Sequence, residues 1–173
     1  SLTISQGVEE IDNFAFYGCN VLEQLVIPTS VKRIGDYAFR GALSATSIVL
    51  PETLETVGKH AFYGTTATIY CEADTLPATW NERWNSSFAP LVIGCTLSED
   101  KSYLVSFTKG ETNPDNLMPE QFISAPVRDD HTFLGFSLSA SSSEIAYTAE
   151  TLKDIPVGTT VYTVWNQNDT TTE

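Results

Sequence analysis

The sequence predicts a mainly β chain with short helical turns, built as a repeat solenoid that is followed by a second, smaller β module. Three observations lead to this fold class. Apolar residues and glycines recur every 23 residues through the first third of the chain, a proline ends the strand-like triplet of two copies, and longer alternating runs take over after about residue 103. A fixed period of this size is the signature of a solenoid, in which each repeat buries its apolar face on its neighbours.

Each repeat has the same expected order of elements. An apolar triplet at 2–4, 25–27 or 48–50 alternates like a strand, and Pro28 or Pro51 ends it because proline cannot donate to a sheet ladder. A second extended piece, a glycine turn and an Ala-Phe pair on a single helical turn complete the unit. The 23-residue spacing is kept by four sets of positions: Ile4, Ile27 and Leu50; Val8, Val31 and Leu54; Ile11, Ile34 and Val57; Gly18, Gly41 and Gly64.

Stacking of the repeats predicts which side chains meet. Strand alternation points the first and third residues of each triplet inward, and it points Val26 and Val49 outward on a shared face. Neighbouring strands lie about 4.8 Å apart. We therefore expect Phe16, Phe39 and Phe62 to form a continuous aromatic spine.

Residues 27–41 read Ile-Pro-Thr-Ser-Val-Lys-Arg-Ile-Gly-Asp-Tyr-Ala-Phe-Arg-Gly, and three copies keep this phase. The pattern resembles the BspA-like leucine-rich repeat over about residues 1–71. Two positions depart from it: Asp12 replaces the turn glycine in the first copy, and the turn cysteine survives only as Cys19. The resemblance implies a bacterial protein that is displayed on the cell surface or secreted.

The repeat period breaks between residues 65 and 95. Terminal repeats are atypical because they cover the exposed end of the core, and Trp80 and Trp84 suit such a cap; the alternative is a sugar-stacking platform. Cys71 and Cys95 bracket this segment. They are a possible disulfide, or else two separately buried thiols.

The C-terminal part has expected strands at 103–107, 132–136 and 160–165. Residues 125–136, together with Tyr162 and Trp165, resemble the Listeria–Bacteroides repeat, the B-repeat of internalins. That resemblance implies a small β-grasp-like module that serves as a spacer or adhesive unit on bacterial surface proteins. His131 stands where that family favours an aromatic residue, and Phe136 stands where it favours Trp.

The repeat phase is already under way at residue 2, so we expect a fragment of a longer protein. The predicted organisation is a solenoid at 1–95 with repeats at about 2–24, 25–47 and 48–66 and a cap at 67–95, a linker at 96–102, a β-grasp-like module at 103–166 and a tail at 167–173.

Composition and motifs exclude several classes of function. The net charge of −13 is the wrong sign for nucleic acid and for an anionic membrane surface, and no run of 18 apolar residues could insert into a membrane. The cysteines and histidines lack metal-ligand spacing, and no phosphate loop or nucleophile elbow is present, so we expect no cofactor and no enzyme. Residues 129–131, Asp-Asp-His, are interpreted as a solvated loop because consecutive extended residues point apart.

The remaining candidate site is a surface. Repeat stacking places Tyr17, Arg40 and Tyr63 in one column, and Phe14, Tyr37 and His60 in the next. Tyr and Arg most often carry binding energy at interfaces, although such rings could also merely cover the flank. The resulting hypothesis is adhesion to, or recognition of, an extracellular protein or glycan of a host or neighbouring cell. Two alternatives stay open: a stalk or spacer for another domain, and a carbohydrate-binding appendage that uses Trp80 and Trp84.

Overall fold

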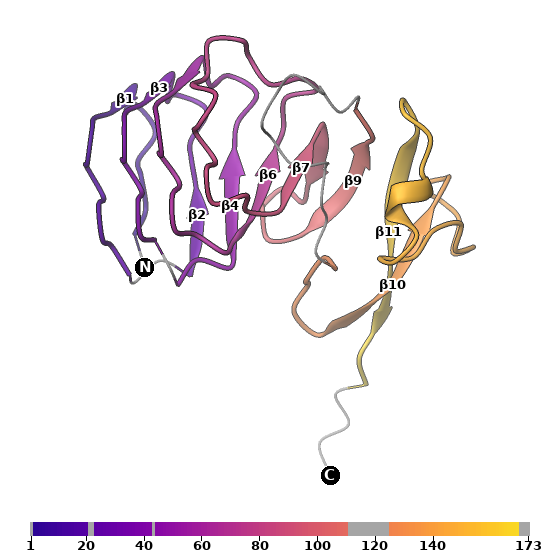
Figure 1. The fold of residues 1–173 in the computed structure, drawn as a ribbon. Coiled ribbons are helices and arrows are strands. Elements are labelled where there is room, and N and C mark those ends of the chain that lie inside the picture. Colours follow the sequence, from indigo (N-terminus) through magenta and orange to yellow (C-terminus); the bar gives the residue numbers. More distant parts are fainter. Residues whose placement is uncertain (1, 21–22, 43, 111–124, 170–173) are drawn as a thin grey trace.

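The computed structural model describes residues 2–20, 23–42, 44–110 and 125–169. Within them, eleven strands form three sheets, and one short 3-10 helix lies outside the sheets. Two parallel sheets belong to stacked coils, and an antiparallel third sheet follows them along the molecule (Figure 1). The arrangement is mainly β, as the sequence predicts.

The coils of the solenoid are held by two sheets whose strands pair 23 residues apart or close to it. The shorter sheet contains β1 (Glu10–Ile11), β3 (Arg33–Ile34) and β5 (Thr56–Val57), with Ile34 opposite Val57. The longer sheet has the order β2-β4-β6-β7. Its strands are β2 (Gln24–Val26), β4 (Ser47–Leu50), β6 (Thr68–Cys71) and β7 (Leu91–Ile93), all parallel to their neighbours.

Two expected local structures differ in the structure. Residues 2–4 form no strand. The Ala-Phe segments are consecutive turns and not a helical turn, because alternate N–H groups bond to the next coil. In the first copy the N–H of Phe16 donates to Ala38, whereas that of Tyr17 donates back to Phe14. The described residues contain one helical element, η1 (Leu152–Asp154), and it lies outside the solenoid.

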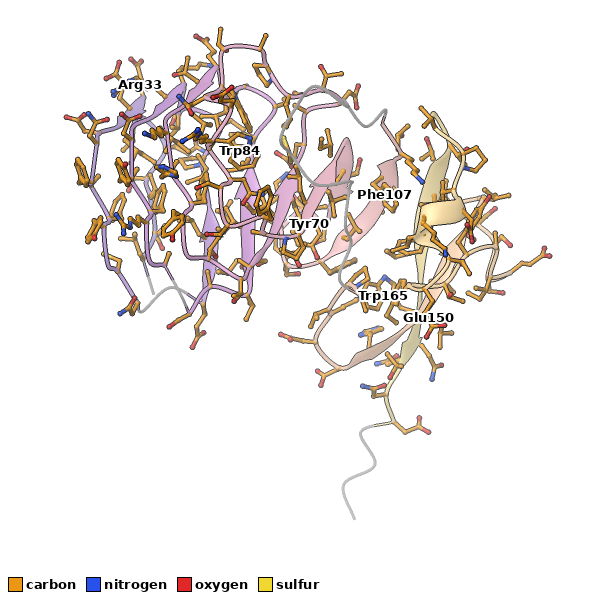
Figure 2. The ribbon with its side chains drawn as sticks, in the orientation of Figure 1. Arg33, Tyr70, Trp84, Phe107, Glu150 and Trp165 are labelled. Atoms are coloured by element: carbon orange, nitrogen blue, oxygen red, sulfur yellow. The ribbon has the colours of Figure 1, made fainter. Side chains whose placement is uncertain are left out.

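The aromatic spine runs through the solenoid core. The rings of Phe16 and Phe39 stack at 5.1 Å, and those of Phe39 and Phe62 at 5.5 Å. Trp84 continues the line at 5.9 Å from Phe62, and Trp80 meets Trp84 edge-on at 5.0 Å. Figure 2 shows Trp84 inside the stack of coils. The exposed fractions are only 7% for Trp80 and 2% for Trp84, so neither indole offers a face to a sugar. This burial overturns the sugar-platform alternative.

The third sheet begins directly after the last solenoid strand. Its order is β10-β11-β9-β8, with every pair antiparallel. Residues 96–102, which we expected to be a linker, contain the end of β8 and the turn to β9. The four strands are β8 (Cys95–Leu97), β9 (Leu104–Thr108), β10 (His131–Ser137) and β11 (Thr160–Gln167).

The outward face of the longer solenoid sheet is not free surface. Val49, Tyr70 and Val92 point away from the spine, yet they are 1%, 8% and 0% exposed. They belong to a second core with side chains of the third sheet and of the segment between β10 and β11, and Figure 2 shows Tyr70 and Phe107 on the two sides of this junction. The third-sheet members are Cys95, Leu97, Leu104, Phe107, Phe136 and Val161, joined by Leu152 and Ile155. The solenoid and the C-terminal module therefore share a hydrophobic core.

Candidate functional site

The two predicted columns form one continuous patch on the solenoid flank, which we call the aromatic flank: Phe14, Tyr17, Tyr37, Arg40, His60 and Tyr63. Phe14 stacks on Tyr37 with ring centres 5.1 Å apart and planes 3° from parallel. Tyr37 lies 5.2 Å from His60, and His60 meets Tyr63 edge-on at 5.6 Å. Phe14, Tyr17 and Tyr63 are 55%, 52% and 42% exposed, so large apolar faces remain open to solvent.

Arg40 lies among three tyrosine rings. Its Cζ is 5.5 Å from the ring centre of Tyr17, 5.6 Å from that of Tyr37 and 5.1 Å from that of Tyr63. These cation–π contacts fix the half-buried guanidinium without using its N–H donors. In the described part of the chain, no carboxylate pairs with Arg40 and no oxygen accepts a hydrogen bond from its side chain. The donors are therefore available to a ligand.

A shallow pocket opens at the centre of the flank. It holds about 220 Å³ and is lined by Tyr37, Arg40, His60 and Tyr63. Sites that enclose a drug-sized molecule usually measure about 300–1,000 Å³. This pocket therefore has room for one small ring or functional group of a larger ligand.

One position of each coil holds a bulky ring in the left-handed backbone region. The φ angles are 60° at Phe14, 57° at Tyr37 and 54° at His60. Glycine or asparagine would adopt this conformation with less strain than an aromatic residue. Ring stacking between coils offsets part of that strain. The rings thus occupy positions where the backbone alone would favour another residue.

Positive charge gathers around the pocket although the chain carries a net charge of −13. The pKa of His60 is lowered, first by burial and then by Lys59, Arg83 and Arg40, with Asp36 acting in the opposite direction. Arg83 is also within 4.0 Å of Glu82. The Nδ1 of His60 lies 2.5 Å from the hydroxyl of Ser86, which fixes the imidazole on the pocket wall.

The two candidate disulfide cysteines are free thiols in the structure. The Sγ of Cys95 donates to the backbone carbonyl of Cys71 at 3.2 Å, and Cys19 is also unpaired with another cysteine. Burial raises the pKa of Cys71 to about 11, and it raises the pKa of Cys95 as well. The structure thus has the two separate buried thiols and not the disulfide.

The Asp-Asp-His segment forms no chemical centre. The Nδ1 of His131 contacts the backbone carbonyl of Asp129 at 2.8 Å, and both aspartates are exposed. Over the described residues, no group of three or more His, Cys, Asp or Glu side chains is placed to hold a metal ion.

Sequence reasoning missed a groove between the solenoid and the C-terminal module. It encloses about 950 Å³, with Thr46 and Thr68 on one side and Tyr103 and Arg128 on the other. The guanidinium of Arg128 lies 4.2 Å from the ring centre of Tyr103. The solenoid wall follows the repeat, since Glu23 and Thr46 are 23 residues apart, but the opposite wall comes from distant segments outside the repeat, so nothing in the sequence indicated that the two walls meet.

The repeat region is similar to a known protein family. A family model described as the BspA type leucine-rich repeat region, 6 copies, matches residues 1–89. The searches of curated proteins and of solved structures gave no match. No helix in the described ranges has both the length and the apolar character needed to cross a membrane. With a matched region that covers just over half of its length, the chain belongs to the BspA-type leucine-rich-repeat family.

Proposed function

We propose that this chain is a non-catalytic recognition unit of a bacterial surface or secreted protein, and that it binds an extracellular protein or glycan through the aromatic flank. The observation that carries the proposal is the position of Arg40, whose guanidinium is fixed among three tyrosine rings while its donors face no protein acceptor among the described residues. Tyr and Arg are the residues in which interface binding energy most often concentrates.

The family supports the setting of this proposal. BspA-type repeats are associated with bacterial surface or secreted proteins, and repeat solenoids of this kind are typically non-catalytic. The extended flank also suits recognition, because stacked repeats present extended binding surfaces.

The mechanism would be complementarity with a surface that is already ordered. Each coil is joined to the next by backbone hydrogen bonds, such as the 2.8 Å bonds from Gly18 to Arg40 and from Gly41 to Tyr63. Stacking then restricts the rings of Phe14 and Tyr37. A preordered surface loses less side-chain entropy on binding, which leaves more of the contact energy for affinity.

A binding screen with matched variants tests the proposal. The purified chain is applied to immobilised matrix proteins, mucins and a glycan panel, beside Tyr17→Ala/Tyr63→Ala. The control is Leu134→Ala/Leu138→Ala, which removes side chains that are 48% and 59% exposed on the C-terminal module. We expect saturable binding that the tyrosine variant loses and the leucine variant keeps. Equal loss in both variants, or no binding at micromolar concentration, would contradict the proposed function.

A spacer role is the second candidate, and one observation favours it. Tyr70 of the solenoid and Phe107 of the third sheet belong to one hydrophobic core, which joins the two parts. The resemblance of residues 103–166 to the Listeria–Bacteroides repeat, a β-grasp-like spacer or adhesive module, agrees with this role. As a spacer, the chain would set the distance between other parts of a surface protein, and on its own it would bind none of the screened ligands.

A further inference from the structure

The backbone N–H and C=O groups of the four residues that line the pocket are already hydrogen-bonded within the protein. The N–H groups of Tyr37 and His60 donate to Lys59 and Arg83 of the next coil or cap, and those of Arg40 and Tyr63 donate within their own turns. The carbonyls of Arg40 and Tyr63 accept from Gly18 and Gly41, and those of Tyr37 and His60 accept from Arg40 and Tyr63. A bound peptide could not extend a sheet here, because strand addition needs free main-chain groups. Recognition at this pocket must rely on side chains.

The side chains supply two kinds of contact. Tyr63 is 42% exposed and its ring offers an apolar face, whereas Tyr37 lies between the rings of Phe14 and His60. The guanidinium of Arg40 carries a full positive charge and several N–H donors. Arginine binds carboxylate and sulfate-like oxyanions with paired hydrogen bonds.

Lys59 and Arg83 also act on His60 as positive charges. Asp36 opposes them, however, and Arg83 lies 4.0 Å from Glu82. The attraction for a negative group therefore rests on Arg40, which pairs with no carboxylate among the described residues.

The size of the pocket limits the ligand to a single ring. A pyranose fits this description, because one face of the sugar ring presents C–H groups that pack on an aromatic ring. Its hydroxyl groups can reach His60 and the tyrosine hydroxyls, while a charged substituent at the ring edge reaches Arg40. An uncharged sugar would offer Arg40 only neutral hydroxyl and ring oxygens, whose hydrogen bonds to a guanidinium are weaker than those of a carboxylate or sulfate group.

We propose, building on the recognition function above, that the aromatic flank binds a negatively charged sugar residue, whose carboxylate or sulfate group contacts Arg40 and whose ring packs against the exposed ring of Tyr63. The charged group sets the specificity and the rings add contact area. The ligand would be a unit of an acidic glycan, with neighbouring sugars extending along the column toward Tyr17.

Three sugars that differ only at carbon 6 test the charge requirement: glucuronic acid, glucose 6-sulfate and glucose. The full chain is labelled with ¹⁵N, and the Nε–H signal of Arg40 is followed by NMR during each titration. We expect at least one charged sugar to shift this signal saturably, with affinity about tenfold or more above that of glucose, the difference expected from one charged hydrogen bond. The carboxylate and sulfate arms separate the two possible sources of charge.

Arg40→Gln should abolish the preference for the charged sugars, and Arg40→Lys should restore it only in part because the planar fork is lost. The control is Arg33→Gln, which removes the same charge from the same repeat at a site where Arg33 lies 3.8 Å from Glu10 and 3.7 Å from Asp12. It should bind like the wild type. Thermal melting of each variant shows whether it is folded, and the signals of Tyr37 and Tyr63 follow binding where the arginine signal is absent.

The outcomes separate this inference from the proposed function. Equal binding of glucose and the charged sugars would overturn the charge requirement and leave the flank as a recognition surface. Failure of all three sugars, with protein ligands still captured in a way that depends on Tyr17 and Tyr63, would overturn the sugar class alone. Failure of both screens would overturn both proposals.

Discussion

The side-chain carboxylate of Asp36 accepts a hydrogen bond of 2.8 Å from the backbone N–H of Lys59, one coil further along the solenoid. Asn13 makes the same 2.8 Å contact with the N–H of Asp36. This ladder explains the turn glycines. A Cβ on Gly58 would lie 2.4 Å from Asp36 Oδ1 and 2.5 Å from its backbone nitrogen, closer than side chains approach in proteins. The coils can be this close only where the residue has no side chain.

Gly58→Ala is therefore expected to lower the free energy of unfolding by about 3 kcal/mol, the upper end of the usual effect of overpacking. Urea denaturation measures the change. Gly158→Ala is the control, because a methyl group there would meet no atom within 4 Å, although Gly158 differs from Gly58 in having a positive φ of 82°. That variant should lose only about 1 kcal/mol from backbone strain. Equal losses in the two variants would contradict the close-approach explanation.

The aromatic spine predicts a graded effect of truncation. Phe39 is fully buried between two stacked rings, whereas Phe16 is partly exposed. Phe39→Ala should cost about 3–5 kcal/mol because it leaves a cavity in the core, and Phe16→Ala should cost clearly less. The comparison uses urea unfolding of both variants. A loss at Phe16 as large as the loss at Phe39 would show that the cost of truncation does not follow burial along the spine.

The 23-residue period could predict the repeats, the spine and the columns of the flank, because each of these joins residue i to residue i+23. Phe16 meets Phe39 and Phe14 meets Tyr37 for this reason. Contacts without a period could not be found in this way. The covering of Val49 by the third sheet depends on pairing between distant segments, and so does the groove beside Tyr103.

The sequence also could not predict local conformation at positions where hydrogen bonds to the next coil determine it. The Ala-Phe pair has ordinary helical propensity, but Phe16 donates to the next coil and the helix does not form. In the same way, the positive φ of Tyr37 could not be anticipated, because bulky residues rarely adopt it.

The shared core predicts that the solenoid and the C-terminal module unfold together. Trp80 and Trp84 lie in the solenoid core, and Trp165 lies on β11 of the third sheet. Fluorescence therefore reports on the third sheet alone once the two solenoid tryptophans are replaced, while circular dichroism reports on the strands of both parts. With Trp80 and Trp84 replaced by Phe, the fluorescence of Trp165 and the far-ultraviolet circular dichroism should give one coincident thermal transition, as a two-state unit does. Tyr70→Ala should lower the free energy of unfolding by about 3 kcal/mol or more, because it leaves a cavity in the shared core. The midpoint temperatures of the two signals should therefore fall together. Separate midpoints for the two signals would mean that the second core does not couple the modules.

The cysteines predict an order of chemical reactivity. Cys19 is partly exposed, whereas Cys71 and Cys95 are buried and have raised pKa values, so little thiolate forms there. Iodoacetamide near pH 8 should modify Cys19 first and reach the other two only after unfolding. Mass spectrometry of digested samples identifies the modified residue. Rapid native modification of Cys71, or a Cys71–Cys95 disulfide in the untreated protein, would contradict the assigned state.

His60 predicts a pH dependence of stability. Its pKa in the folded state is lowered from 6.5, first by burial and then by Lys59, Arg83 and Arg40, against Asp36. The unfolded chain therefore binds a proton more readily, and the His60 contribution to stability falls as the pH drops from about 6.5 toward the lower folded-state pKa. His60→Gln removes the titration but keeps a polar group beside Ser86. Chemical denaturation at about pH 8 and pH 5 should show a smaller loss of stability in His60→Gln than in the wild type. If His60→Gln lost as much stability as the wild type between these two pH values, protonation of His60 would not be the cause of the loss.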